Sequence, residues 1–309
     1  MRWVVPIFFI LASAFAAPRL VTAPAQEMNE VSPEILEQPA WLILEYGKRA
    51  MDEGEYGVAL RYFREALSKE PILPEAEMLI GDIFFGEGNF FLAERQYQKA
   101  LDQSHQLYIL DERYTILEKL AGLYQVMPGR DDDYREALVQ IVLEDADFNA
   151  ARESPLGERY MEILSQDGFD YLVTLYRLDS HAELIAHTRL GMLYHAEEDY
   201  RMSTLHFIFA VLTVFSKGIE ELKFHDPDYL YEDAREFFRR TARYDLITEY
   251  FSDTMLYLNL YYLADSLSRL MPDGGRNSAV ELFRLVEELA ATDQVRRLAS
   301  RRLAEIGLQ

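Results

Sequence analysis

Cysteine is absent from all 309 residues of this chain. Its absence excludes a disulfide framework, a thiol nucleophile, a cysteine zinc site and a lipid-modified cysteine. Basic residues are also scarce, because 31 Lys and Arg stand against 53 Asp and Glu and give a formal net charge of -22. Phosphate contacts need clustered cations, so this balance argues against a nucleic-acid partner. It favours a basic or cation-bridged protein partner instead.

Long apolar runs are rare as well, and the most N-terminal one has the form of an export signal. Residues 3–16 are apolar, follow the lone basic residue Arg2 and lead into small residues, which is the order of a secretory signal peptide. We therefore expect a signal peptide over residues 1–16, with cleavage possible as late as Ala25, and an exported protein that is periplasmic or secreted. The alternative is a membrane-tethered protein held by an uncleaved 3–16 segment.

The segment after the signal contains four prolines, so we expect residues 17–39 to form an extended tether before a folded part that starts near Ala40. From there onward apolar residues recur at helical spacing, and no stretch alternates with period two. The later run Leu205–Phe215 has 11 residues, too few to cross a bilayer, and is expected to be a buried helix. The sequence therefore predicts an all-α fold without a stable membrane span after signal cleavage.

An internal repeat of 34 residues is the strongest pattern in the chain. The aligned pairs are Gly47 with Gly81, Gly54 with Gly88, Tyr56 with Phe90, Ala59 with Ala93, Phe63 with Tyr97, Ala66 with Ala100 and Leu67 with Leu101. We interpret each unit as two helices, A and B, that approach closely at the small residues, with the aromatic residues filling the space between them. A single hairpin cannot bury both of its faces, so such units must stack on one another.

These residues resemble the tetratricopeptide repeat, whose pattern of small, glycine, acidic, aromatic and proline positions is met over residues 40–105. In the first unit the matching residues are Gly47, Gly54, Glu55, Tyr56, Ala59, Phe63, Ala66 and Pro71, while Ala50 stands where the family has an aromatic residue. A third copy reproduces the spacings over 181–216 through Gly191, Tyr194, Asp199, Tyr200, Ser203, Phe207 and Ala210. The resemblance implies a right-handed α-solenoid of antiparallel helix pairs.

The remaining segments fit the repeat less well. Residues 106–180 and 217–292 are expected to be degenerate repeat-like helices, of which two pairs require insertions, at Met127–Arg130 and at Pro272–Gly275. The last stretch, 293–309, has an apolar stripe and several arginines, and we expect a capping helix with a polar outer side.

In the resembled family, helix A residues line a groove that holds a peptide. Carried over by position, the groove residues are Trp41, Leu44, Lys48 and Met51 in the first unit and Met78, Asp82 and Phe85 in the second. The alternative interpretation is that Trp41, Met78 and Phe85 pack against neighbouring repeats or the tether. The Lys and Asn positions of the carboxylate-clamp subgroup are occupied by Leu44 and Lys48, which argues against chaperone C-termini as ligands.

No pattern in the chain indicates a catalytic, metal or cofactor site. The six histidines lack the helical spacing of a zinc motif, and the acidic runs at 131–133 and 197–199 are expected to cap helices at turns. Residues 122–128 resemble the glycine-rich stretch of lytic transglycosylases, but the pair Glu153–Ser154 follows that stretch, whereas in that family it precedes it. A peptidoglycan-cleaving enzyme is therefore only a remote alternative.

These observations favour a non-enzymatic scaffold or adaptor that binds one or more proteins or peptides of the cell envelope. A second hypothesis is a soluble carrier that encloses a small ligand, suggested by the aromatic-rich segment Tyr244–Tyr262. Every partner hypothesis depends on the compartment to which the chain is delivered.

Overall fold

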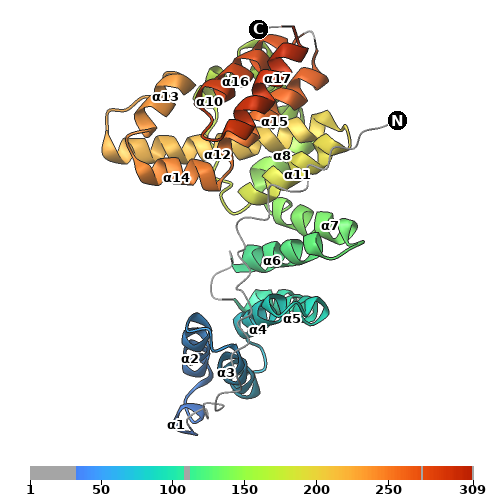
Figure 1. Cartoon of the computed structure of the whole chain (residues 1–309), viewed down its shortest axis with the longest axis vertical. Helices are drawn as coiled ribbons and strands as arrows, with labels where there is room; N and C mark the ends of the chain where they lie inside the picture. The colour runs from blue at the N-terminus through green and yellow to red at the C-terminus, as the bar shows by residue number, and fades with distance from the viewer. Residues whose placement is uncertain (1–32, 108–111, 273, 308–309) are drawn as a thin grey trace. The chain divides into compact units, whose positions relative to one another are not determined.

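The computed structural model describes residues 33–107, 112–272 and 274–307, and within these ranges the chain folds into seventeen α-helices and one short 3-10 helix, with no strand (Figure 1). The all-α fold predicted from the periodicity is confirmed. The predicted signal peptide, its cleavage site and most of the tether lie outside the described residues. The chain divides into two compact units, unit 1 up to Pro128 and unit 2 from Gly129.

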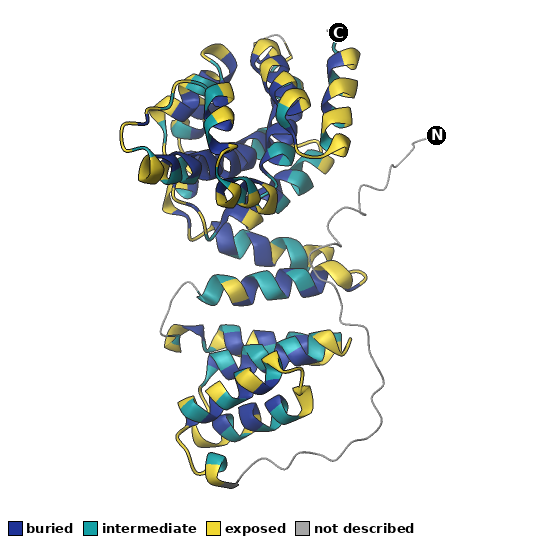
Figure 2. Ribbon diagram, turned by 60° about the vertical axis from the view of Figure 1, so that its left-hand side comes forward, coloured by how far each residue is buried: buried dark blue, intermediate teal, exposed yellow. Residues whose placement is uncertain are grey.

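Unit 1 consists of helices that pack on their neighbours in chain order. Its helices are α1 (Pro33–Leu36), α2 (Ala40–Asp52), α3 (Tyr56–Lys69), α4 (Pro74–Gly86), α5 (Phe90–Asp102), the 3-10 helix η1 (Ser104–Gln106) and α6 (Glu112–Val126). The pairs α2 with α3 and α4 with α5 correspond to the two predicted repeat units, and α3 with α4 and α5 with α6 join them to the next helix. Figure 2 shows buried residues on the inward sides of these helices.

Within each helix pair of unit 1, the two helices approach closely at the predicted glycine. A Cβ on Gly81 would lie 2.5 Å from Cε1 of Tyr97, and a Cβ on Gly47 would collide with the ring of Phe63. Both rings are buried, so each aromatic side chain occupies the space that a larger residue in helix A would need. The interpretation of these positions as close-packing sites is confirmed.

The turns inside the pairs are closed by the predicted glycines. Gly54 and Gly88 have φ values of +79° and +77°, in the left-handed region that favours glycine. In each turn the glycine N–H bonds to the carbonyl three residues back, and the next N–H bonds to the carbonyl five residues back. This is the Schellman pattern that ends a helix and redirects the chain.

Residues before α2 depart from the prediction of an extended tether up to residue 39. α1 is a short helix, and its residues Ile35 and Leu36 pack against the hydrophobic core of unit 1. Because apolar side chains gain free energy by leaving water, this turn of helix covers part of the core beside α2. Helical structure is therefore already present at Pro33–Leu36, within the segment expected to be an extended tether.

Unit 2 is arranged around one long helix. Its helices are α7 (Asp131–Val142), α8 (Ala146–Glu153), α9 (Pro155–Gln166), α10 (Phe169–Leu175), α11 (Leu184–Ala196), α12 (Tyr200–His225), α13 (Ala234–Thr241), α14 (Asp245–Asp253), α15 (Leu256–Leu270), α16 (Arg276–Leu289) and α17 (Asp293–Glu305). α12 packs against α9, α10, α11, α13, α14 and α15. The contacts in unit 2 thus extend beyond sequence neighbours, because α9 also packs against α16.

The third repeat copy is the pair α11 and α12. A Cβ on Gly191 would lie 2.8 Å from Cζ of Phe207, as in the two pairs of unit 1. Glu198 occupies the turn position held by glycine in the other copies and has a φ of +65°. Ser203 replaces the small alanine and donates from its hydroxyl to the carbonyl of Gly191 at 2.9 Å. The same local geometry therefore occurs three times within the described residues.

α12 is longer than the predicted unit, which ends at residue 216. It continues to His225, and its apolar side stays covered because Ile219 and Leu222 are buried. α12 is the one described helix long and apolar enough to cross a bilayer, with a mean hydropathy of 1.5 over its most apolar window, but 83% of that window is buried inside the structure. Most of the apolar surface of that window is therefore covered by the helices around it.

The boundary between the units lies in the turn Met127–Arg130, where the sequence predicts an insertion within one helix pair. The C-terminal helix α17 packs on α15 and α16. Its side chains Ala299 and Leu303 are buried, and Arg296, Arg297 and Arg301 are exposed. Arg302 differs from the prediction, because it turns inward to a buried carboxylate on α15.

Candidate interaction surface

The predicted groove residues lie on helices α2 and α4 of unit 1, and we call this set the helix-A face. Trp41 is 62% exposed, whereas Leu44 is only 4% exposed. The other five predicted residues are half-buried: Lys48, Met51, Met78, Asp82 and Phe85. Leu44 is a correction, since it belongs to the hydrophobic core of unit 1 and its side chain offers almost no surface to a ligand. Phe85 contacts Phe90, with ring centroids 5.7 Å apart.

Lys48 joins consecutive A helices. Its Nζ lies 2.7 Å from Oε1 of Glu45, one turn earlier in α2, and 2.5 Å from Oε1 of Glu75 in α4. Burial alone would lower the pKa of Lys48, but the hydrogen bonds to both carboxylates outweigh it and raise the pKa above its usual value. Lys48 therefore stays charged and links α2 to α4.

Asp82 plays the equivalent part between α4 and α6. The Tyr97 hydroxyl donates to its Oδ1 at 2.7 Å, and the Lys119 ammonium lies 2.8 Å from the same oxygen. Burial, followed by the neighbouring Asp82 charge, raises the pKa of Tyr97 far above its usual value, so the phenol remains a donor. The polar residues of the helix-A face are thus partnered within unit 1, and Trp41 is its most exposed apolar member.

Carboxylates outnumber cations around Lys48 of the helix-A face. Glu112, at the start of α6, has a raised pKa because of its partial burial and then because of the Glu75 charge, with Lys48 acting in the opposite direction. Lys48 is therefore surrounded by Glu45, Glu75 and Glu112. An approaching cation would relieve this repulsion, so the electrostatics favour a ligand with basic side chains.

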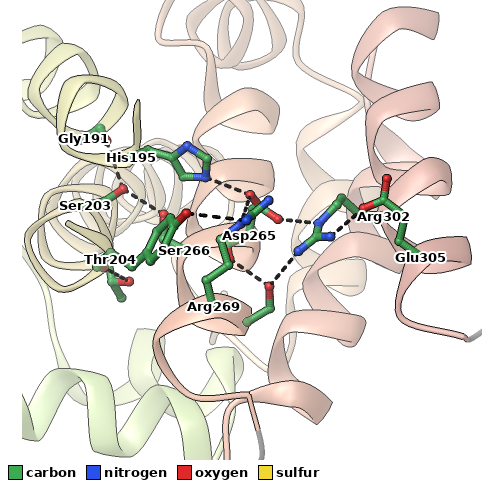
Figure 3. Close-up of polar contacts among 11 residues, drawn as sticks. Gly191, His195, Ser203, Thr204, Asp265, Ser266, Arg269, Arg302 and Glu305 are labelled. Atoms are coloured by element: carbon green, nitrogen blue, oxygen red, sulfur yellow. Dashed lines mark hydrogen bonds and ion pairs between the residues drawn. The ribbon is translucent and has the colours of Figure 1, made fainter. Parts of the chain in front are cut away.

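Unit 2 contains a buried carboxylate that ties three helices together, and sequence reasoning missed it (Figure 3). Asp265 of α15 is buried. Its carboxylate accepts hydrogen bonds from Nε2 of His195 on α11 at 2.8 Å and from Nε of Arg302 on α17 at 2.5 Å. Arg269 adds a third contact at 2.9 Å. Burial would raise the pKa of Asp265, but the hydrogen bond from His195 and the two guanidinium charges lower it to about 2.

A second buried network joins α8, α11 and α12. His187 and His206 face each other with their Nδ1 atoms 2.9 Å apart, and Nε2 of His187 lies 3.4 Å from Oδ2 of Asp145. Asp145 also caps α8 by accepting from the N–H of Phe148. Burial lowers the pKa of both histidines, which favours neutral rings. When a neutral His187 donates from Nε2 to Asp145, its Nδ1 accepts from Nδ1 of His206, so each ring has one defined tautomer.

Glu153 and Asp199, from the segments considered for catalysis or metal binding, are both exposed. Glu153 is exposed, and its carboxylate bonds to Arg152 at 2.7 Å, whereas a general acid needs a buried site that raises its pKa. Within residues 33–107, 112–272 and 274–307 there is no group of three or more His, Asp or Glu side chains suited to a metal ion. Asp199 accepts from the N–H of Met202 at 3.1 Å, which confirms its predicted role as a helix cap.

The aromatic segment Tyr244–Tyr262, which suggested a small-ligand carrier, is largely used in packing. Tyr262 stacks on Phe207 with ring centroids 5.5 Å apart, and Tyr257 stacks on Phe238 at 5.4 Å. Phe251 is buried against Phe237. These rings fill the interior of unit 2 around α12 and α15, so their number does not by itself require a ligand.

No protein-family model matches the chain. Among curated proteins, the chain is 22% identical over 278 residues to an uncharacterised protein of Borreliella burgdorferi, which covers 82% of this chain and 85% of that protein. It is 26% identical over 237 residues to an uncharacterised protein of Treponema pallidum, covering 75% of this chain and 62% of that protein. The resemblance to the tetratricopeptide repeat therefore stands on the residues and contacts described above.

Proposed function

We propose that this protein is an exported, non-enzymatic scaffold of the tetratricopeptide type that binds another protein of the cell envelope. In this proposal the helix pairs form a right-handed solenoid, most regular in unit 1, and α17 caps the C-terminal end. The observation that carries the proposal is the threefold recurrence of one helix-pair geometry, with Gly47 on Phe63, Gly81 on Tyr97 and Gly191 on Phe207. Repeated pairs of this kind serve as binding surfaces in many solenoids.

The helix-A face of unit 1 is the proposed binding surface. Trp41 provides an exposed aromatic anchor, a residue type that contributes strongly at protein interfaces. The carboxylates around Lys48 favour a partner segment with Lys or Arg. The ion pairs of Lys48 and Asp82 hold α2, α4 and α6 in place, so the surface is formed before a partner arrives.

Site-specific photocrosslinking tests this surface. A benzophenone side chain would replace Trp41 in one variant and Met78 in another, and the exposed α3 residue Arg64 would carry it as a matched control. We expect one shared partner to be captured from both helix-A positions and not from Arg64. Equal capture from all three positions, or none from Trp41 and Met78, would exclude the helix-A face as the binding surface.

A second measurement separates binding from folding. Trp41→Ala removes an exposed side chain, so the thermal melt should change little, whereas affinity for the captured partner should fall about tenfold or more. Lys48→Glu is less suitable because it also breaks the ion pair with Glu75. A basic partner further predicts that affinity decreases as the salt concentration rises.

Export is tested independently of binding. We expect cell fractionation to find the chain outside the cytoplasm, with a mature N-terminus at Ala17 or as late as Gln26. Detection of an intact N-terminus on a membrane-bound form would favour the tethered alternative. A cytoplasmic location would contradict the proposed compartment.

A further inference from the structure

Three large apolar side chains project from one region of unit 2. Phe224 at the end of α12 and Leu246 at the start of α14 are each 81% exposed, and Leu230 in the intervening loop is 75% exposed. Figure 1 shows α13 and α14 beside the C-terminal half of α12, and both helices contact it. We call residues 223–230 and 243–246 the α12–α14 tip. Such exposure leaves apolar surface in water that a partner or an interface can cover.

Ring stacking holds the parts of the tip together. The His225 ring stacks on Tyr244, with centroids 4.3 Å apart and planes within 11°, so the end of α12 meets the start of α14. Phe224 and Leu246 are close in sequence to this stack and therefore belong to the same corner of the unit.

The loop that carries Leu230 is also anchored. Arg240 of α13 pairs with Asp226 at 3.3 Å, and its guanidinium lies 6.0 Å from the ring centroid of Tyr229. Tyr229 is buried, so the chain is fixed immediately before Leu230. Below the tip, Phe237 and Phe251 pack on Gly218 of α12, where a Cβ would lie 2.6 Å from Cζ of Phe237. The exposed side chains thus stand on a packed base.

Cations accompany the exposed apolar side chains. Lys223 directly precedes Phe224, and Arg243 lies three residues before Leu246. Both are exposed, and in the part of the chain that the structure describes neither forms a salt bridge. The neighbouring α13 adds Arg239, whose exposed guanidinium pairs with Glu236 of the same helix at 3.6 Å. Unpaired cations such as Lys223 and Arg243 beside apolar residues are the combination that anionic lipid surfaces bind.

We propose that the α12–α14 tip docks on an anionic lipid surface, with Phe224, Leu230 and Leu246 entering the interface and Lys223 and Arg243 contacting lipid phosphates. The tip also contains three carboxylates. Asp226 is paired with Arg240, whereas Asp228 and Asp245 oppose this attraction and make the docking weak and sensitive to lipid charge. The proposal does not depend on the helix-A face, which lies in the other unit.

Fluorescence quenching by brominated lipids tests insertion at this position. Phe224→Trp would be made in a background in which Trp3 and Trp41 are both replaced by Phe, and Phe91→Trp in the same background is the control. Phe91 is 78% exposed but belongs to unit 1. With vesicles of phosphatidylcholine and about 30% brominated phosphatidylglycerol, we expect quenching and a blue shift only for the indole at position 224. This readout is specific to the site even if residues 3–16 also hold the chain on the vesicle.

Charge variants provide the second arm in a vesicle co-sedimentation assay. Lys223→Glu with Arg243→Glu should reduce binding strongly, since each cation near an anionic surface changes binding about fivefold. Asp228→Asn with Asp245→Asn should increase binding to the same vesicles. Neither pair should matter with vesicles of phosphatidylcholine alone. A thermal melt of each variant checks that unit 2 stays folded.

Three results would overturn the proposal. The first is an absence of quenching at position 224, and the second is equal quenching at positions 224 and 91. The third is concentration-dependent dimerisation, seen by light scattering, that Phe224→Ser abolishes while lipid binding is unchanged; that outcome would assign the tip to a contact between two copies of the chain.

Discussion

At the residue scale, one missing Cβ sets the distance between paired helices. Gly81 in α4 meets the Tyr97 ring at a separation that leaves no room for a methyl group, and Gly191 meets Phe207 in the same way. Because the aromatic rings are buried, they cannot swing into solvent to relieve a clash. Gly81, Gly191 and the equivalent Gly47 are therefore required by packing and not by backbone conformation, since none of these three glycines has a positive φ.

Gly81→Ala should destabilise the protein by about 1 to 3 kcal/mol, because the added methyl group overpacks the contact with Tyr97. The gain in helix propensity of about 1 kcal/mol is already opposed by this clash. Urea denaturation would measure the change in the free energy of unfolding. Gly122→Ala in α6 is the control, since no atom lies within 4 Å of its added Cβ, and it should be neutral or stabilising. An equal effect of the two substitutions would contradict the packing argument.

Glu198→Gly should stabilise the protein by about 1 kcal/mol, because Glu198 holds a left-handed conformation that costs an L-residue about that much. The reverse change, Gly54→Ala, should destabilise by a similar amount, since Gly54 has the same conformation in the first turn. Thermal melts of both variants would measure the shifts. Opposite signs are expected, and a common sign would show that the side chains, not the turn conformation, determine the effect.

At the element scale, helices far apart in the sequence are joined by buried polar residues. Asp265 connects α15 to α11 through His195 and to α17 through Arg302. A buried carboxylate with two guanidinium partners is costly to disrupt, because removing it leaves cations without compensation. This contact fixes the orientation of α17 more specifically than its apolar stripe does.

Asp265→Asn should reduce the free energy of unfolding by about 3 kcal/mol, because Arg302 and Arg269 lose their counter-charge. Glu305→Gln, which affects only the exposed partner of Arg302, should change the free energy of unfolding by less than about 1 kcal/mol.

The contribution of Asp265 also depends on pH, because the unfolded state binds a proton at Asp265 more readily than the folded state. This contribution is therefore present above about pH 4 and is lost as the pH falls toward 2. Denaturation of both variants at pH 7 and at pH 3 would measure it, and the difference between wild type and Asp265→Asn should shrink at pH 3.

The contrast between these contacts and the repeat shows what the sequence could predict. Gly47 and Phe63 lie 16 residues apart in a pattern that recurs, so self-comparison reveals their partnership. His195 and Asp265 are 70 residues apart and occur once, so no local periodicity marks them as partners. The burial of Leu44 was also missed, because a helix position alone does not show how closely the next helix covers it.

The unit boundary shows the same limit at the level of elements. The turn at Met127–Arg130 has proline and glycine, which predict a turn but not a division between compact units. Likewise the extra length of α12 follows from helices that cover it from several sides, which a repeat period does not encode. Element type and the α11–α12 pair were therefore predictable, whereas the contacts between helices of unit 2 that are not neighbours in the sequence were not.

At the scale of the whole molecule, the histidines are distributed unequally between the two units. His187 and His206 are buried in unit 2, whereas His105, the single histidine of unit 1, is exposed. Protonation of His187 would remove the acceptor that His206 needs, and the cost of burying the charge outweighs the attraction to Asp145. The stability of unit 2 should therefore depend on pH near neutrality in a way that the stability of unit 1 does not.

Acidification from pH 7 to pH 5 should selectively destabilise unit 2. Burial lowers the pKa of His187 and His206 in the folded state. Below about pH 6.5 the unfolded state therefore binds more protons than the folded state, and the free energy of unfolding decreases as the pH decreases. The loss is at most about 1.4 kcal/mol per pH unit for each histidine. Hydrogen exchange measured by mass spectrometry should show faster exchange at pH 5, after correction for the intrinsic rate, in peptides of α8, α11 and α12 but not of α2 to α5.

Two variants test whether this pH dependence comes from the buried pair of His187 and His206. His206→Phe can still stack on Tyr194 but cannot be protonated, so it should reduce the pH dependence of unit 2 to the part that His187 contributes, even if it lowers stability at pH 7. His225→Gln, at an exposed position, should leave the dependence unchanged. Equal loss of protection in both units of the wild-type chain would instead indicate a general effect of the many carboxylates. The buried histidine pair would then not be the group that couples folding to pH.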